Sequence, residues 1–169
     1  AVDGVRMNTA IFRSGNLQNV ISLDPFSLEN TEILFGPGSV MYGSDAIGGV
    51  MNFETLQPKQ EGLSGNVVSR FASAYDEKTV HADLAYGGEK WKFLSSATLF
   101  DYGDLKMGDR NGPDSYLRKK YVGQVNGEDT EIENTNPLIQ VGSAYKQMNL
   151  MQKIQFKPKE NSTWDYGFH

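Results

Sequence analysis

The most informative stretch of this sequence begins with Thr31-Glu32-Ile33-Leu34-Phe35-Gly36-Pro37-Gly38-Ser39-Val40-Met41-Tyr42-Gly43. After two polar residues it continues with Ala46-Ile47-Gly48-Gly49-Val50-Met51-Asn52-Phe53. Its apolar runs, 33–35, 40–42 and 50–53, are short and are separated by glycine. Such runs predict short buried strands joined by tight turns. Gly36 and Gly38 around Pro37 permit a sharp turn, and Gly48-Gly49 permits a close approach of two backbones. We therefore expect a small mixed α/β unit here.

The flanks of this stretch indicate where that unit extends and where it stops. Before it, Asp24 suits a helix N-cap and Glu29 suits an early helical turn, because the first amides of a helix attract carboxylates. Pro25 suits the first helical position. After it, proline and charge interrupt the pattern over residues 56–61. We predict one domain portion over residues 1–56 and a linker over 57–62.

Beyond the linker, apolar and polar residues alternate with a period of two, which a sheet with one apolar and one polar face imposes. We expect strands near 63–75, 79–87, 91–102, 143–156 and 163–169. The predicted apolar face, which would face lipid if the sheet crosses a membrane, carries Leu84, Tyr86, Leu150, Ile154 and Phe156. The opposite face carries His81, Asp83, Asn149 and Gln155.

The predicted connections between these strands differ in length. Residues 76–78, 87–90 and 157–162 are typical of tight turns, whereas residues 103–142 form one long polar segment. Barrels of the bacterial outer membrane place short turns in the periplasm and long loops outside. If the linker leaves the first domain on the periplasmic side, the long connection lies outside, as required. Trp91 and Trp164 follow short turns, where a belt of interfacial aromatic residues is expected.

The order of the glycine motifs resembles the plug of TonB-dependent outer-membrane receptors. Val2-Asp3-Gly4-Val5-Arg6 is also similar to a strand-turn-strand of such plugs. The resemblance implies a mixed fold, with the C-terminal part of an α/β plug followed by antiparallel strands of a transmembrane β-barrel. Residues 63–169 would supply about five of an expected 22 or so strands. Because five strands cannot close, we expect a piece of a longer protein, or another chain that completes the barrel.

Two positions depart from the family pattern. Asn30 and Phe35 stand where the family usually has arginine, and the second arginine is thought to join a polar lock between plug and barrel. Glu32 remains, and we predict a plug–barrel contact with a barrel arginine such as Arg70, because an unpaired buried carboxylate is costly. The run from Gly36 to Ser39 is similar to iron and haem receptors rather than to glycan importers of the same superfamily.

The composition excludes several other functions. The net charge is −5 and no Lys/Arg stripe is present, which argues against nucleic acid as a partner. There is no cysteine, and the only histidines are His81 and His169, so we expect no metal site and no histidine-based catalysis. The glycines do not form a nucleotide loop, because no Lys-Ser/Thr follows them. We predict a protein that is not an enzyme and carries no cofactor.

The resemblance implies TonB-dependent active uptake of a scarce iron complex, a siderophore or haem, across the outer membrane of a Gram-negative bacterium. The plug apex and the extracellular loops would bind the complex, and the barrel would contact outer-membrane lipid. TonB would bind through a segment absent from this chain. Two alternatives stay open: a soluble β-rich binding module, and a passive porin or adhesin barrel.

The predicted plug apex is the polar segment from Asn8 to Asn19. Its aromatic, cationic and amide groups suit an anionic, partly aromatic ligand, and they come from Phe12, Arg13, Asn16, Gln18 and Asn19. Gly15-Asn16-Leu17 resembles a Gly-His-Leu motif of haem receptors, but an amide is a poor ligand for haem iron. Two hypotheses follow: haem held by loops outside this chain with Arg13 on a propionate, or a ferric siderophore whose iron is already saturated.

Overall fold

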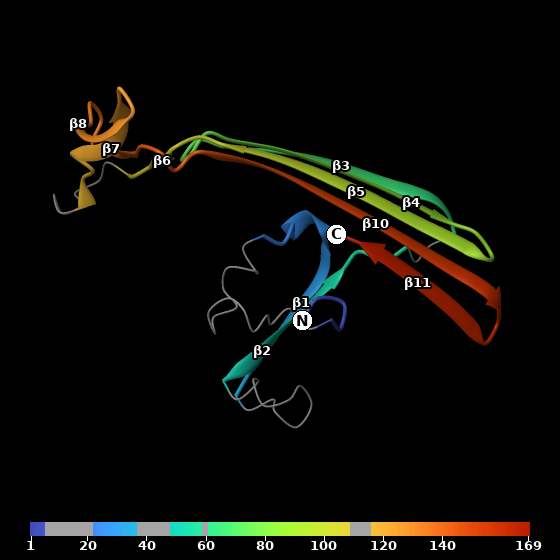
Figure 1. Ribbon diagram of the computed structural model, residues 1–169. Helices are drawn as coiled ribbons and strands as arrows, with labels where there is room; N and C mark the ends of the chain where they lie inside the picture. The colour runs from blue at the N-terminus through green and yellow to red at the C-terminus, as the bar shows by residue number, and fades with distance from the viewer. Residues whose placement is uncertain (6–21, 37–47, 59–60, 109–115) are drawn as a thin grey trace. The chain divides into compact units, whose positions relative to one another are not determined.

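The structure is a computed structural model that describes residues 1–5, 22–36, 48–58, 61–108 and 116–169. Among these residues, one 3-10 turn accompanies a five-stranded sheet and three two-stranded sheets (Figure 1). No helix in the described part of the chain is long and apolar enough to cross a membrane. The predicted predominance of antiparallel strands is confirmed.

The chain divides into two compact units. The first comprises Ala1–Asn66, Ala82–Thr98 and Asn149–His169, and the second comprises Val67–His81 and Leu99–Met148. This division does not test the predicted boundary near residue 56, which stays a prediction.

The N-terminal segment consists of a tight turn, the helical turn η1 (Pro25–Ser27) and a ribbon of β1 (Leu28–Phe35) and β2 (Gly49–Thr55). Asp3 and Gly4 both have positive φ, 47° and 79°, in a turn closed by pairing of Val2 with Val5. Positive φ at both central residues is the geometry of a type I′ hairpin turn. The predicted turn is therefore present, flanked by isolated bridge residues rather than by strands, and Arg6 lies outside the described residues.

Two predictions for this segment are wrong in part. Asp24 does cap η1, but the helix ends at Ser27, and Glu29 lies in β1 rather than in a helical turn. The strands were expected to be buried, whereas Phe35 is 92% exposed. A two-stranded ribbon has two faces, and within the described residues only the end of β2 that carries Phe53 and Thr55 is buried. The apolar run at residues 40–42 lies outside the described residues.

The five-stranded sheet has the order β11-β10-β5-β4-β3 (Figure 1). Its strands are β3 (Gly62–Ala72), β4 (Glu77–Gly87), β5 (Trp91–Tyr102), β10 (Tyr145–Lys159) and β11 (Ser162–Phe168). All five predicted strands are present, but β3 is shorter than expected and β10 runs further. Glu77 and Lys78, which were predicted in a turn, begin β4.

On β4, β5 and β10, apolar residues are exposed on one face, and polar residues are buried on the other together with Leu94, Phe100 and Met151. The strands β3 and β11 are exposed along nearly their whole length. Leu84, Tyr86 and Leu150 are exposed, whereas His81 is buried. The other residues of the predicted faces are half-buried, namely Asp83, Asn149, Ile154, Gln155 and Phe156. The buried polar face also carries Ser96, Thr98 and Lys153. Burial of polar groups requires hydrogen-bonding partners, and these partners define the site described below.

The connection between β5 and β10 is more ordered than a long polar loop. It contains β6 (Leu105–Lys106) paired with β9 (Ile139–Gln140), and a hairpin of β7 (Lys120–Val125) and β8 (Glu128–Glu133). Asn126 and Gly127, with φ of 54° and 85°, form the hairpin turn. Asn-Gly is the preferred pair for such a turn, so the local sequence accounts for it.

Candidate functional site

Asp3 connects the N-terminal turn to the buried polar face of the sheet, at β10. The Lys153 Nζ lies 2.8 Å from Asp3 Oδ2, and the two side chains are 9% and 24% exposed. Thr55 donates to the same carboxylate twice, from its backbone nitrogen to Oδ1 at 2.8 Å and from Oγ1 to Oδ2 at 2.5 Å. The largely buried ammonium of Lys153 is thereby neutralised, which removes most of the cost of burying it.

The surroundings of Asp3 favour its charged form. Burial by itself raises the pKa of Asp3, but the hydrogen bonds from Lys153 and Thr55 outweigh burial and place the pKa below its ordinary value. The carboxylate is therefore ionised at neutral pH, as an ion pair with Lys153 requires. His169 Nε2 lies 3.8 Å from Asp3 Oδ2 and adds a second positive group when it is protonated.

Asp24 forms a second contact of the same kind, this time with β5. Its carboxylate accepts hydrogen bonds from the Phe26 nitrogen, from Ser27 Oγ and from Thr98 Oγ1. Ser27 Oγ also lies 3.3 Å from Ser96 Oγ. Asp24, Ser27, Ser96 and Thr98 are all buried. Asp24, which caps η1, therefore also attaches η1 to the polar face of the sheet.

The predicted contact between Glu32 and Arg70 is not tested by the structure. Glu32 is exposed on β1, opposite Asn52. Arg70 lies on β3, and its Nε is 3.3 Å from Oε2 of Glu77, whose side chain is 2% exposed. Thr79 Oγ1 donates to the other oxygen of Glu77 at 2.7 Å. Arg70 thus already has a carboxylate partner within the second unit, and its pairing with Glu32 stays a prediction.

Three tyrosines accompany Arg70 in the second unit. The ring centroids of Tyr75 and Tyr102 are 5.7 Å apart, and those of Tyr102 and Tyr145 are 4.6 Å apart in a stacked arrangement. Arg70 Nη2 lies 3.5 Å from the Tyr75 hydroxyl. Hydrogen bonding to Glu77 is the main effect that raises the pKa of Tyr75, which therefore stays a neutral phenol. Aromatic rings beside a guanidinium suit an anionic ligand with a flat surface.

The residues predicted to bind ligand, Phe12, Arg13, Asn16, Gln18 and Asn19, lie outside the described residues. Nothing in the structure therefore tests them. Among the residues that are described, no group of three or more His, Cys, Asp or Glu side chains could hold a metal ion.

Sequence reasoning missed the contacts of Asp3 and Asp24 with the sheet. One signal was available: Lys153 occupies an inward position of a strand between Met151 and Gln155, and an inward lysine needs a carboxylate. The identity of that carboxylate was not accessible, because Asp3 is 150 residues away in the chain. Asp24 was identified as a helix cap, but a cap requires only local partners, so Thr98 could not be anticipated.

A family model described as the TonB-dependent Receptor Plug Domain matches residues 1–50. The match includes Asp3, Asp24 and most of the β1–β2 ribbon, and the amphipathic sheet follows it along the chain. Residues 1–50 are therefore similar to the plug domain of TonB-dependent receptors. Asp3 and Asp24 lie within this plug match, and Lys153 and Thr98 lie on the sheet that follows it.

Receptors of named iron compounds are similar to this chain. A ferric aerobactin receptor of Escherichia coli is 33% identical over 81% of the chain and 18% of its own length. A rhizobactin receptor of Rhizobium meliloti is 34% identical over 53% of the chain and 12% of its own length. A hemin receptor of Yersinia pestis is 43% identical over 51% of the chain and 13% of its own length. The chain therefore spans less than a fifth of the length of these relatives.

Proposed function

We propose that the intact receptor takes up an iron complex across the outer membrane of a Gram-negative bacterium, with energy supplied through TonB. The observation that supports this most strongly is the match of residues 1–50 to a receptor plug, followed by strands that bury a polar face and expose an apolar one. A wall of such strands has its apolar face toward lipid and its polar face toward the lumen.

The plug contacts suggest how the receptor stays closed between transport events. Asp3 and Asp24 bind the polar face through Lys153 and Thr98. A hydrogen bond to a charged group contributes about 1.5–3 kcal/mol, so a few such contacts hold the plug in place but are within reach of an external pull. Ligand would enter from the side of the long β5–β10 connection, and TonB would act from the other side.

The expected ligand is an iron complex with negative charge. Two of the reported relatives are named for siderophores and one for hemin, so these three do not decide between the two classes. Arg13 and Phe12 of the proposed apex are suited to an anionic ligand with an aromatic part, whereas the guanidinium of Arg70 is already paired with Glu77. This set fits haem and aromatic ferric chelates better than a neutral ligand.

The domain limits, the membrane location and the partners are part of this proposal. The plug portion would end near residue 56, residues 63–169 would form the first strands of the barrel, and the connection between β5 and β10 would be extracellular. TonB, the iron complex and outer-membrane lipid would be the partners. Either the rest of the receptor or another chain would complete the barrel wall.

A haem titration of the intact receptor tests the ligand. If haem is the ligand, the Soret band shifts and binding saturates at one equivalent, and Arg13→Gln weakens binding. If a ferric siderophore is the ligand, haem causes no spectral change, whereas ferric hydroxamate or catecholate chelates quench tryptophan fluorescence at saturable concentrations. A receptor that binds neither haem nor any ferric chelate would contradict the proposed function.

A further inference from the structure

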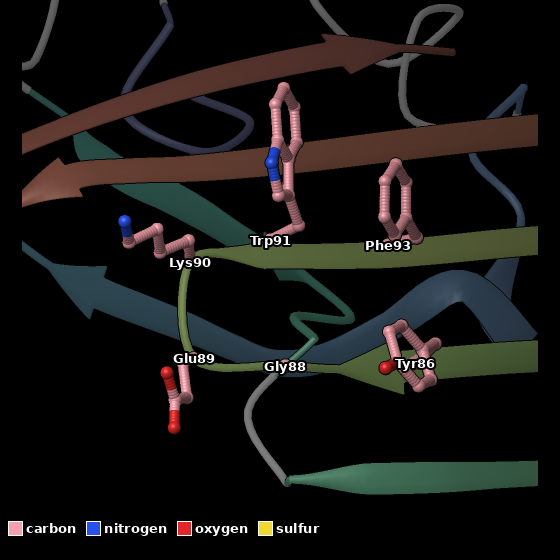
Figure 2. Close-up of a pocket in the computed structure, with 6 residues that line it drawn as sticks. All are labelled: Tyr86, Gly88, Glu89, Lys90, Trp91 and Phe93. Atoms are coloured by element: carbon pink, nitrogen blue, oxygen red, sulfur yellow. The ribbon is translucent and has the colours of Figure 1, made fainter.

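An open depression lies on the exposed apolar side of the sheet, where β4 turns into β5. Its volume is about 490 Å³, and it is lined by Tyr86, Gly88, Glu89, Lys90, Trp91 and Phe93 (Figure 2). A volume of this size can accommodate a small molecular group. The plug contacts do not involve any of these residues, so the depression is a separate feature of the receptor.

The floor of the depression is made of aromatic rings that support one another. The Trp91 ring stacks on Phe156, with centroids 4.1 Å apart, and lies nearly parallel to Phe93 at 6.0 Å. Tyr86 covers Gly88, since a β-carbon at position 88 would lie 3.6 Å from the Tyr86 ring. Aromatic side chains with one polar end are favoured where a membrane meets water. The floor is therefore suited to the glycerol and upper acyl region of a lipid.

Two opposite charges stand at the rim of this floor. Glu89 and Lys90 are both exposed, and neither side chain has an ion pair or hydrogen bond within the described part of the chain. Figure 2 shows the two side chains pointing in different directions from the turn. They do not neutralise each other, so each is available to a group of opposite charge. Such a rim complements a ligand that carries one negative and one positive group.

We propose that this depression binds the headgroup of a zwitterionic phospholipid, phosphatidylethanolamine, with Lys90 on the phosphate and Glu89 on the ammonium group. The inference rests on the proposed location in the outer membrane. The turn is short, as the periplasmic turns of outer-membrane barrels are, and this places it at the periplasmic leaflet, which consists of phospholipid. Glu89 disfavours lipids whose headgroup carries only negative charge, such as phosphatidylglycerol and lipopolysaccharide.

The test uses the intact receptor, embedded in nanodiscs that contain equal amounts of phosphatidylethanolamine and phosphatidylglycerol. Lipids that remain bound after release from the nanodisc are counted by native mass spectrometry. We expect phosphatidylethanolamine to be retained about fivefold over phosphatidylglycerol, because Glu89 can pair with the ammonium group that phosphatidylglycerol lacks; this factor corresponds to about 1 kcal/mol, the upper range for an exposed ion pair. The double variant Glu89→Gln/Lys90→Gln should lose this preference.

The neighbouring turn supplies a matched control. Lys159 and Glu160 are an adjacent, exposed pair of opposite charge at the β10–β11 turn, and they do not line the depression. Lys159→Gln/Glu160→Gln should retain the preference. Equal retention of the two phospholipids by the unaltered receptor, or equal loss in both double variants, would overturn the assignment. Preferential retention of added lipopolysaccharide would do the same. Recovery of the receptor in the outer-membrane fraction, measured separately, shows whether the proposed function has failed instead.

Discussion

The ammonium group of Lys153 lies 2.8 Å from the carboxylate of Asp3, a residue 150 positions earlier in the chain. The two residues belong to different parts of the receptor, the plug and the sheet that follows it. Since this contact joins residues far apart in the sequence, its strength bears directly on how firmly the plug is held.

Replacing Lys153 with methionine should loosen the plug. The change leaves Asp3 partly buried without its cation, and we expect the local opening free energy to fall by about 1.5–3 kcal/mol. Hydrogen exchange of the Thr55 amide reports this, because that amide donates to Asp3 Oδ1 at 2.8 Å. Lys157→Met, an exposed position on the same strand, is the control and should leave the exchange unchanged. Equal protection in both variants would show that the ion pair contributes little.

The Asp3 contact should depend on pH only in the acidic range. The folded pKa of Asp3 is lowered, so its contribution to stability is present above the unfolded value of about 3.9 and is lost as the pH falls through the folded value. We expect constant protection of the Thr55 amide, after correction for intrinsic exchange, from pH 7 to about 5 and a decline below about 4. Asp3→Asn should abolish the decline. A decline centred near pH 6 would assign it to a group other than Asp3.

A disulfide can test the contact between η1 and β5. Ser27 Oγ and Ser96 Oγ are 3.3 Å apart, and the sequence contains no cysteine that could interfere. We expect Ser27→Cys/Ser96→Cys to form a disulfide under mild oxidation, detected by a mobility shift that reductant reverses. Ser27→Cys/Ser95→Cys is the control, because Ser95 lies on the opposite face and donates to Gln152. Equal crosslinking of both pairs would contradict the finding that Ser96, and not Ser95, lies on the face of β5 that contacts η1.

Gly49 should be much less tolerant of substitution than its neighbour. A β-carbon at position 49 would lie 2.7 Å from the Leu34 carbonyl oxygen, and the φ of Gly49 is 144°. At Gly48 nothing lies within 4 Å. Gly49→Ala should therefore destabilise the β1–β2 ribbon by more than about 1 kcal/mol, whereas Gly48→Ala should be nearly neutral. The effects of Gly49→Ala and Gly48→Ala can both be measured as the protease sensitivity of the plug in the intact receptor. Similar sensitivity would mean that the two backbones are not in close contact.

The sheet was predictable from sequence because alternation is a local signal. Leu84, Tyr86 and Leu150 alternate with polar residues, and a period of two has only one structural interpretation over such lengths. The β7–β8 hairpin was missed although Asn126-Gly127 favours a type I′ turn, because the polar composition around it suggested a loop. The turn chemistry outweighed the composition.

The candidate site was only partly predictable because its partners are distant in sequence. The capping role of Asp24 depends on the next three residues and was found, whereas its contact with Thr98 depends on the tertiary fold. The predicted pairing of Arg70 with Glu32 followed the expectation that a plug acid needs a barrel cation. In the structure Arg70 is paired with Glu77, a nearby residue on the adjacent strand. Local partners therefore compete with long-range ones in ways that residue types alone do not reveal.

Energy-dependent uptake tests the central claim most directly. The intact receptor would be expressed in two otherwise identical strains that lack their own iron receptors, one with TonB and one without it. Radioactive iron would then be supplied as the complex that the receptor binds. We predict accumulation inside cells only in the strain with TonB, while binding at the surface is equal in both. Equal accumulation without TonB would contradict the account, because it would mean a passive pore.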